Sequence, residues 1–226
     1  MPCRDADSPA WSPDGTQIAF NRIDNVDGHN PGSQLQAVDV ATGAITTLAS
    51  TTGAEYAGAA RWSPDGRSIV VGLGRYIDDG NDTDTVTGAA IAVLDLDDAT
   101  PEFRVIRAFD TFATYPDWHP TEDLILFAAG AKDPLDPSDP PSNLFTIRSD
   151  GTGLAQLTRQ GPDDDGIWMP AFRRDGSGII ATLVDRPGGG LSLVSLDADG
   201  TGLADLDAHG RTSGAHSRQR PVPPAR

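Results

Sequence analysis

Lysine, glutamate and cysteine are almost missing from this 226-residue sequence. Lys132 is the only lysine, three of the 33 acidic residues are glutamate, and Cys3 is the only cysteine. One cysteine excludes an internal disulfide and a zinc site built from several cysteines. Glutamate and lysine favour helices whereas aspartate, glycine and proline favour turns, so this composition, with 25 Gly and 18 Pro, predicts a turn-rich β protein.

Long apolar runs and excess positive charge are also lacking. No run approaches the roughly 18 apolar residues that a membrane helix needs, so we expect no membrane span. The formal net charge of −16 would repel a phosphate backbone, which argues against a nucleic-acid partner. The first residues contain no apolar core of the kind found in a signal peptide.

What the sequence does contain is a twelve-residue pattern that occurs four times. The copies begin at residues 9, 60, 116 and 170, and the first one reads PAWSPDGTQIAF. Each copy is followed by a second apolar run, a turn and a further short run. Each unit of about 50 residues therefore predicts four short strands, and repetition at this period indicates a repeat architecture.

The turn inside the pattern has a mechanical basis. Proline presets φ at the second position, aspartate tolerates the third, and glycine accepts a positive φ at the fourth. We expect the anchor aromatics of the four copies to occupy one equivalent, buried position in successive blades. The residues of this repeat signature are Trp11, Asp14, Gly15, Trp62, Asp65, Gly66, Trp118, Phe172, Asp175 and Gly176.

Four antiparallel strands per repeat predict an all-β fold, a β-propeller of four four-stranded blades. We place the propeller at 1–207, with blades at about 9–48, 60–106, 116–158 and 170–206. A basic Pro/Arg tail at 208–226 is expected to be disordered. The tail has four arginines and no acidic residue, so residues 1–207 hold 13 basic and 33 acidic residues, a net charge of −20.

The WSPDGxxIAF pattern resembles the WD-like propeller repeat of the TolB family, which also occurs in the propellers of prolyl oligopeptidase-type serine peptidases. The resemblance covers about residues 5–208, and copies three and four depart from it, with His119 in place of serine and Phe172 in place of tryptophan. Propellers of this family have six blades, whereas this sequence supplies four. The chain is therefore either part of a larger ring or a self-contained ring, arc or intermolecular assembly. An arc would leave two blade faces free for self-association.

No familiar catalytic motif is present. The sequence has no GxSxG nucleophile elbow, no HExxH metal motif and no phosphate-binding loop, so we predict no catalytic residue and no cofactor. The four histidines are scattered, and His119 takes the place of a turn serine. A structural role is favoured for His119, because catalysis would require a partner carboxylate and a cleft.

Acidic loops remain as candidate interaction sites. Residues 78–84 contain Asp78, Asp79, Asp82 and Asp84, an oxygen-rich spacing that can hold Ca²⁺. They do not match the twelve-residue calcium loop, because the sixth-position glycine and the terminal glutamate are not in register, so we predict no metal site and favour a solvated variable loop. We predict that a partner binds at this loop and at three others, so the candidate interaction loops are 24–31, 78–87, 133–141 and 162–166.

These observations predict a non-catalytic propeller scaffold, TolB-like, that binds a protein or peptide, with a basic partner favoured by the charge. The alternative is the propeller portion of a prolyl oligopeptidase-type peptidase, or of a sugar-active propeller enzyme, whose catalytic part is not in this chain. The resemblance implies a location outside the cytoplasm, while the N-terminal sequence shows no signal peptide, so localisation stays open.

Overall fold

The computed structural model describes residues 4–24, 32–51, 53, 55–77, 85–133, 136, 138–161, 164–185 and 190–206. Within these residues the regular secondary structure consists of strands and includes no helix. The strands form four antiparallel sheets of four strands each. The sheets are grouped in two compact units that divide after Thr111. The all-β fold of four four-stranded blades predicted from the repeats is confirmed.

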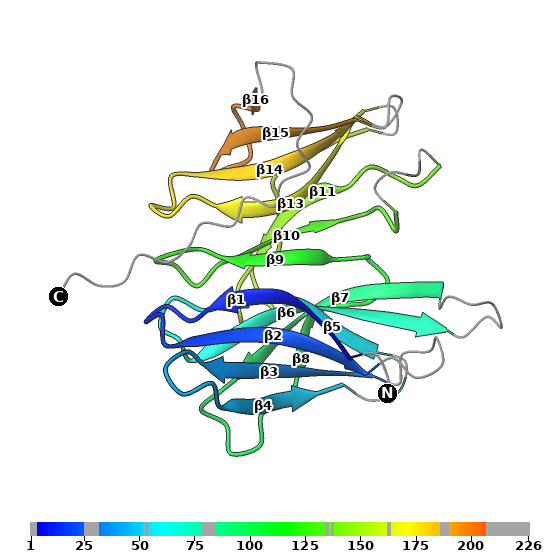
Figure 1. The fold of residues 1–226 in the computed structure, drawn as a ribbon. Coiled ribbons are helices and arrows are strands. Elements are labelled where there is room, and N and C mark those ends of the chain that lie inside the picture. Colours follow the sequence, from blue (N-terminus) through cyan, green and yellow to red (C-terminus); the bar gives the residue numbers. More distant parts are fainter. Residues whose placement is uncertain are drawn as a thin grey trace. The chain divides into compact units, whose positions relative to one another are not determined.

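The first unit contains two sheets, each in simple sequential order (Figure 1). The first sheet consists of β1 (Arg4–Trp11), β2 (Gln17–Asp24), β3 (Ser33–Asp39) and β4 (Ile45–Ser50). The second consists of β5 (Glu55–Trp62), β6 (Ser68–Ile77), β7 (Thr85–Asp95) and β8 (Arg104–Arg107). In an antiparallel sheet of this order, the β1–β2 and β3–β4 turns lie at one end and the β2–β3 connection at the other.

The second unit repeats this arrangement. Its first sheet consists of β9 (Thr114–Trp118), β10 (Ile125–Ala129), β11 (Asn143–Ile147) and β12 (Ala155–Gln156). Its second sheet consists of β13 (Gly166–Phe172), β14 (Gly178–Asp185), β15 (Gly190–Asp197) and β16 (Ala204–Asp205). The outer strands β12 and β16 have two residues each, and both of those residues are exposed.

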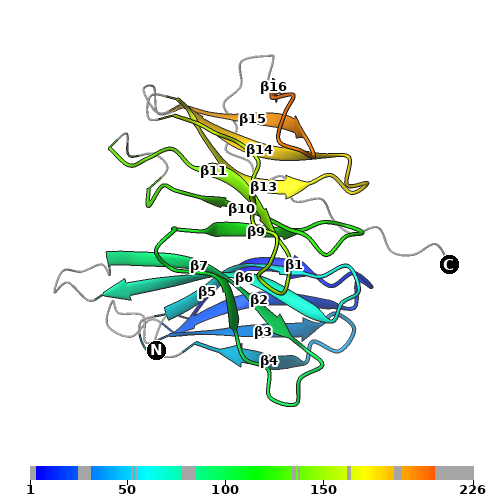
Figure 2. The ribbon, with the colours of Figure 1, turned by 180° about the vertical axis from the view of Figure 1, so that it is seen from behind.

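The two sheets of the first unit stack face to face, as both views of the ribbon show (Figures 1 and 2). Fully buried aliphatic side chains meet between them, Leu35 from β3 with Ile69 from β6 and Leu94 from β7. A hydrogen bond of 2.8 Å from the backbone N–H of Ala57 to Ser33 Oγ also joins the sheets. The first strands, β1 and β5, lie in contact, so the blades converge on this edge.

The second unit has its own core of the same kind. Leu126 and Leu144 of one sheet pack with Ile179 and Val194 of the other, all nearly inaccessible to water. A backbone N–H of β13, that of Phe172, donates a 2.8 Å hydrogen bond to the Asp117 carboxylate of β9. Apolar packing between neighbouring sheets therefore holds each pair of blades together.

Each first strand contains a bulge that the sequence did not predict. Ser8, Ala59, Tyr115 and Met169 all have φ between 48° and 52°, and each lies three residues before an anchor aromatic. The pairing register shifts at the same places, for example between Asp7 and Ala10 in β1. None of the four residues is glycine, so composition gave no sign of a left-handed backbone there.

Candidate functional site

The repeated turn of the first blade fixes an aspartate carboxylate at the sheet end. Ser12 Oγ donates to Asp14 Oδ1 at 2.6 Å and accepts the N–H of Gln17 at 2.9 Å. The backbone N–H of Thr16 donates to the same carboxylate oxygen at 3.0 Å. Gly15 closes the turn with φ of 73°, the left-handed conformation predicted for it.

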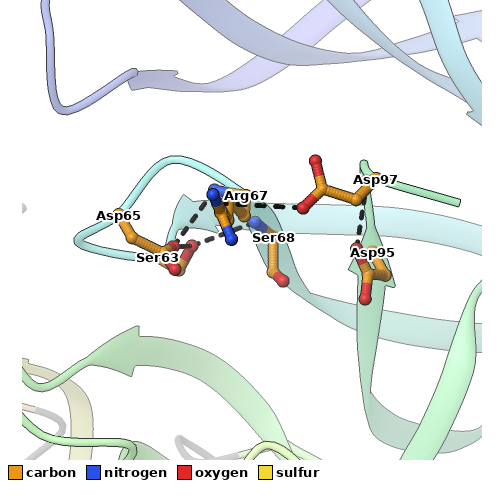
Figure 3. Close-up of polar contacts among 6 residues, drawn as sticks. All are labelled: Ser63, Asp65, Arg67, Ser68, Asp95 and Asp97. Atoms are coloured by element: carbon orange, nitrogen blue, oxygen red, sulfur yellow. Dashed lines mark hydrogen bonds and ion pairs between the residues drawn. The ribbon is translucent and has the colours of Figure 1, made fainter.

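The second blade repeats the same network, as Figure 3 shows. Ser63 Oγ donates to Asp65 Oδ1 at 2.6 Å and accepts the N–H of Ser68 at 3.0 Å. The N–H of Arg67 donates to Asp65 at 3.1 Å, while its guanidinium lies 3.8 Å from Asp97. Both partners of that ion pair are largely exposed, so it contributes little to stability.

These hydrogen bonds stabilise the ionised form of both turn carboxylates. The Ser12 hydroxyl, followed by the N–H and hydroxyl of Thr16, lowers the pKa of Asp14 below its ordinary value. The Ser63 hydroxyl and then the N–H of Arg67 do the same for the pKa of Asp65. A carboxylate that accepts several hydrogen bonds stays negative at neutral pH.

A cleft of about 510 Å³ lies between these two turns, within the first unit. The first turn contributes Ser12, Asp14 and Gln17 to its lining, and the second blade contributes Trp62 and Asp65. Pro13 and Pro64 add apolar surface on the two sides. We call this the turn cleft; its volume falls within the range of small-ligand pockets.

Trp62 connects the two blades at the wall of the turn cleft. Its indole Nε1–H donates to the backbone carbonyl of Ala10 at 3.2 Å, from β5 to β1. Trp62 is half-buried. The indole is therefore held by packing and by one hydrogen bond while part of it meets the cleft.

The corresponding place in the second unit is filled. His119 stands where the first two blades have serine, and it is 7% exposed. Its Nδ1 accepts the N–H groups of Glu122 at 3.1 Å and Thr121 at 3.3 Å, so it caps the turn. A side-chain carbon added at Gly176 would lie 2.5 Å from His119 Nε2, which shows how closely the ring fills the space. The structural role favoured for His119 agrees with this geometry.

The anchor aromatics occupy equivalent positions, since each is the last residue of a first strand. The expectation that all would be buried holds only for Trp118, at 9% exposure. Trp11, Trp62 and Phe172 are half-buried. For Trp62 the physical reason is the open cleft beside it. Gly15, Gly66 and Gly176 share φ values of 71° to 73°, as the turn requires.

The acidic residues Asp78, Asp79, Asp82 and Asp84 lie outside the described residues, as do most of 24–31, parts of 133–141 and 162–166, and the tail 208–226. The described strand ends that flank these segments, at the ends of β2, β6 and β10 and at the start of β13, lie at the end of their sheets opposite the signature turns. Over the described ranges, no three histidine, cysteine, aspartate or glutamate side chains gather as a metal site would require. The part of the chain with assigned structure also contains no helix long and apolar enough to cross a membrane.

The turn cleft was missed by sequence reasoning because it requires two turns 51 residues apart to be neighbours in space. A usable signal was nevertheless present. Two consecutive copies have a small serine at the position where the third has the larger His119. A change of side-chain volume at one repeat position predicts that neighbouring blades leave gaps of different size.

Comparison with known proteins shows the fold and no closer relationship. No family model and no curated protein matches the sequence. TolB from Acinetobacter baumannii superposes with a TM-score of 0.63 at 19% identity, over 89% of this chain and 43% of that one.

Two enzymes share the fold to a similar degree. An oligogalacturonate lyase in complex with manganese gives a TM-score of 0.61 at 17% identity, over 88% of this chain and 52% of that one. Prolyl oligopeptidase B from Galerina marginata gives a TM-score of 0.61 at 12% identity, over 89% of this chain and 26% of that one. The chain thus spans about half or less of each protein's length, and the predicted resemblance to TolB-like and prolyl oligopeptidase propellers is confirmed at the level of the fold.

Proposed function

We propose that this chain is a non-catalytic propeller scaffold that binds a basic protein or peptide through the ends of its blades. The observation that carries the proposal is the set of turn carboxylates, which are exposed or nearly so, fixed by hydrogen bonds and ionised. In the first unit two of them, Asp14 and Asp65, border the turn cleft.

The same chemistry recurs in other turns at the same end of each sheet. Hydrogen bonds from Thr42, Ser177 and Thr201 lower the pKa values of the turn aspartates that precede them in the chain. Those aspartates are Asp39, Asp175 and Asp199. One end of each unit therefore carries fixed negative charge, which attracts basic partners and raises their association rate.

Rigidity supports binding as well. The turn carboxylates are held by short local hydrogen bonds on packed sheets, so little side-chain entropy is lost when a partner contacts them. The net charge of −20 on residues 1–207 acts in the same direction.

A second hypothesis is that the chain is the propeller portion of a larger enzyme. Its support is the fold shared with prolyl oligopeptidase B, of which this chain covers 26%, and with the lyase, of which it covers 52%. Saturable binding of an uncharged proline-containing peptide, or of an oligogalacturonate, by the purified chain would favour this hypothesis over the scaffold, and no cleavage is expected because the catalytic part would lie elsewhere.

Titration of fluorescent basic peptides against the full chain at about 50 mM and 0.5 M salt tests the scaffold. Screening contracts from more than 10 Å to about 4 Å over this range, so affinity should fall by at least about tenfold. A peptide of equal length in which acidic residues replace the basic ones is the control and should not bind. Equal affinity at both salt concentrations, or no binding of any basic peptide, would contradict the proposal.

The two ends of the blades are compared with two sets of substitutions. One variant carries Asp14→Asn and Asp65→Asn at the signature turns. The other neutralises the acidic loop favoured by the sequence, with the substitutions Asp78→Asn, Asp79→Asn, Asp82→Asn and Asp84→Asn. The variant that loses affinity identifies the binding end.

A further inference from the structure

We propose that the turn cleft is a binding site for the guanidinium group of an arginine side chain. The inference rests on the proposed function, since it assumes a basic partner, and it names the group and the residues that receive it. It is carried by the cleft's volume, its unused hydrogen-bonding atoms and the indole in its wall.

The turn cleft is large enough to hold an arginine side chain together with the neighbouring residues of its peptide. Pockets of about 300–1,000 Å³ hold ligands of small-molecule size, and this one has about 510 Å³. Its lining comes from two blades, with Ser12 and Gln17 on one side and Trp62 and Asp65 on the other. A side chain entering between the blades would therefore meet polar groups from both sides.

Hydrogen-bonding capacity is left over on these groups. Asp65 uses Oδ1 for the Ser63 hydroxyl and the Arg67 N–H, and Oδ2 receives no hydrogen bond from the described residues. The side-chain amide of Gln17 is likewise without a hydrogen bond to any residue whose structure is described, although its backbone N–H is bonded to Ser12. An ionised acceptor and an amide oxygen in one cleft suit a ligand that consists of donors only, which is what a guanidinium is.

The indole of Trp62 adds the second half of arginine recognition. A guanidinium is attracted to an indole face, and its aliphatic stem packs on apolar surface of the kind that Pro13 and Pro64 provide. Lysine carries a compact, strongly hydrated charge and cannot form the planar, two-pronged contact with a carboxylate. Arginine is therefore expected to bind better than lysine.

The second unit shows that the turn cleft is not a necessary product of the fold. There His119 occupies the equivalent space, with its ring 4.8 Å from that of Phe172 and against Gly176. In the first unit the equivalent residue is Gly66, and a side-chain carbon added there would have Pro13 Cδ, at 3.7 Å, as its nearest neighbour. A planar, nitrogen-bearing ring beside an aromatic side chain is thus already accommodated once in this protein, and a guanidinium would enter the open counterpart in the first unit.

The experiment titrates the full chain with a capped tripeptide that has arginine between two glycines, and follows the Trp62 indole N–H signal by NMR. Counterparts with lysine and with the neutral isostere citrulline are run in parallel. We expect a saturable shift with arginine, weaker binding with lysine, and at least about tenfold weaker binding with citrulline.

Three variants locate the site. Asp65→Asn keeps an oxygen for the turn hydrogen bonds but removes the charge, and should weaken arginine binding about tenfold. Ser12→His introduces at the first turn the ring that fills the second unit, and should abolish binding while the sheet signals persist. Asp123→Asn makes the same charge change at an exposed aspartate of the third blade that accepts one backbone N–H and does not line the cleft, and should leave affinity within about twofold.

The tail supplies the same group within the chain, so the titration is repeated with its arginines changed to glutamine. The substitutions are Arg211→Gln, Arg218→Gln, Arg220→Gln and Arg226→Gln. Tighter peptide binding by this variant would mean that tail arginines compete for the turn cleft, and unchanged binding would assign the arginine to a partner; either result supports the site.

Two results separate this inference from the proposed function. Arginine binding of equal strength to the native chain, Asp65→Asn and Ser12→His would overturn the turn cleft as the site and leave a basic partner bound elsewhere. The absence of any salt-sensitive binding of longer basic peptides would overturn the proposed function itself.

Discussion

The imidazole of His119 and the phenyl ring of Phe172 form an edge-to-face pair, with ring centroids 4.8 Å apart and planes at 79°. The two residues belong to neighbouring blades, β9 of one ending just before His119 and β13 of the other ending at Phe172. One side chain therefore caps its own turn and packs against the next blade. In the first unit the equivalent residue is Ser12, and the space that corresponds to the one filled by the His119 ring is part of the turn cleft.

Removing this ring should destabilise the second unit. His119→Ala loses an edge-to-face contact of about 0.5–1.5 kcal/mol and a turn cap of about 1 kcal/mol, so we expect a loss of about 1–3 kcal/mol in the free energy of unfolding. Urea denaturation followed by far-UV circular dichroism measures it. His119→Asn can restore the cap but not the ring contact and should recover part of the loss; a variant as stable as the native chain would show that the ring contributes nothing.

Gly176→Ala should be more damaging than the same change at Gly15. Both glycines have positive φ, 71° and 73°, so alanine is strained at either position by about 1 kcal/mol. At Gly15 the added carbon meets nothing within 4 Å, whereas at Gly176 it would lie 2.5 Å from His119 Nε2. We therefore expect an additional loss of about 1–3 kcal/mol at Gly176.

A double-mutant cycle isolates the contact behind this difference. In a chain that already carries His119→Ala, the added cost of Gly176→Ala should fall to the value measured at Gly15, because only backbone strain remains. Equal costs with and without the histidine side chain would mean that the ring moves aside freely.

The sequence was sufficient to predict the four sheets, because the repeated turn chemistry and apolar runs are local signals. It also placed His119 in a structural role. It gave no sign of the bulges at Ser8, Ala59, Tyr115 and Met169, where tertiary packing holds ordinary residues in a glycine-like conformation. No local pattern shows that Asp65 and Gln17 border one space, although the change from serine to His119 at one repeat position indicated gaps of different size between blades. The interaction loop favoured from its charge lies outside the described residues, so that prediction stays a prediction.

Trp62 should be a strong contributor to the stability of the first unit. Trp62→Ala removes packing between the blades and the hydrogen bond to Ala10, and the large-to-small scale gives a loss of about 3–5 kcal/mol. Because the indole is half-buried, we expect a value near the lower limit. Trp62→Phe retains most of the packing and loses only the donor, at about 1 kcal/mol. Chemical denaturation of the three proteins measures both, and equal losses for the two variants would show that the hydrogen bond alone matters.

Acid should destabilise the protein in a way that depends on its turn carboxylates. The pKa values of Asp14 and Asp65 lie below their ordinary value of 3.8 in the folded chain, so unfolding favours proton uptake by both groups. Their contribution to stability is complete above pH 3.8 and is lost as the pH falls through the folded-state pKa values.

Urea denaturation between pH 7 and pH 2.5 should therefore show a steep loss of stability below about pH 4. A chain with Asp14→Asn and Asp65→Asn should lose less stability over that interval, because an amide does not titrate. A parallel decline of the variant and the native chain would assign acid sensitivity to other carboxylates, and NMR titration of the two side chains would then show pKa values near 3.8 rather than below it.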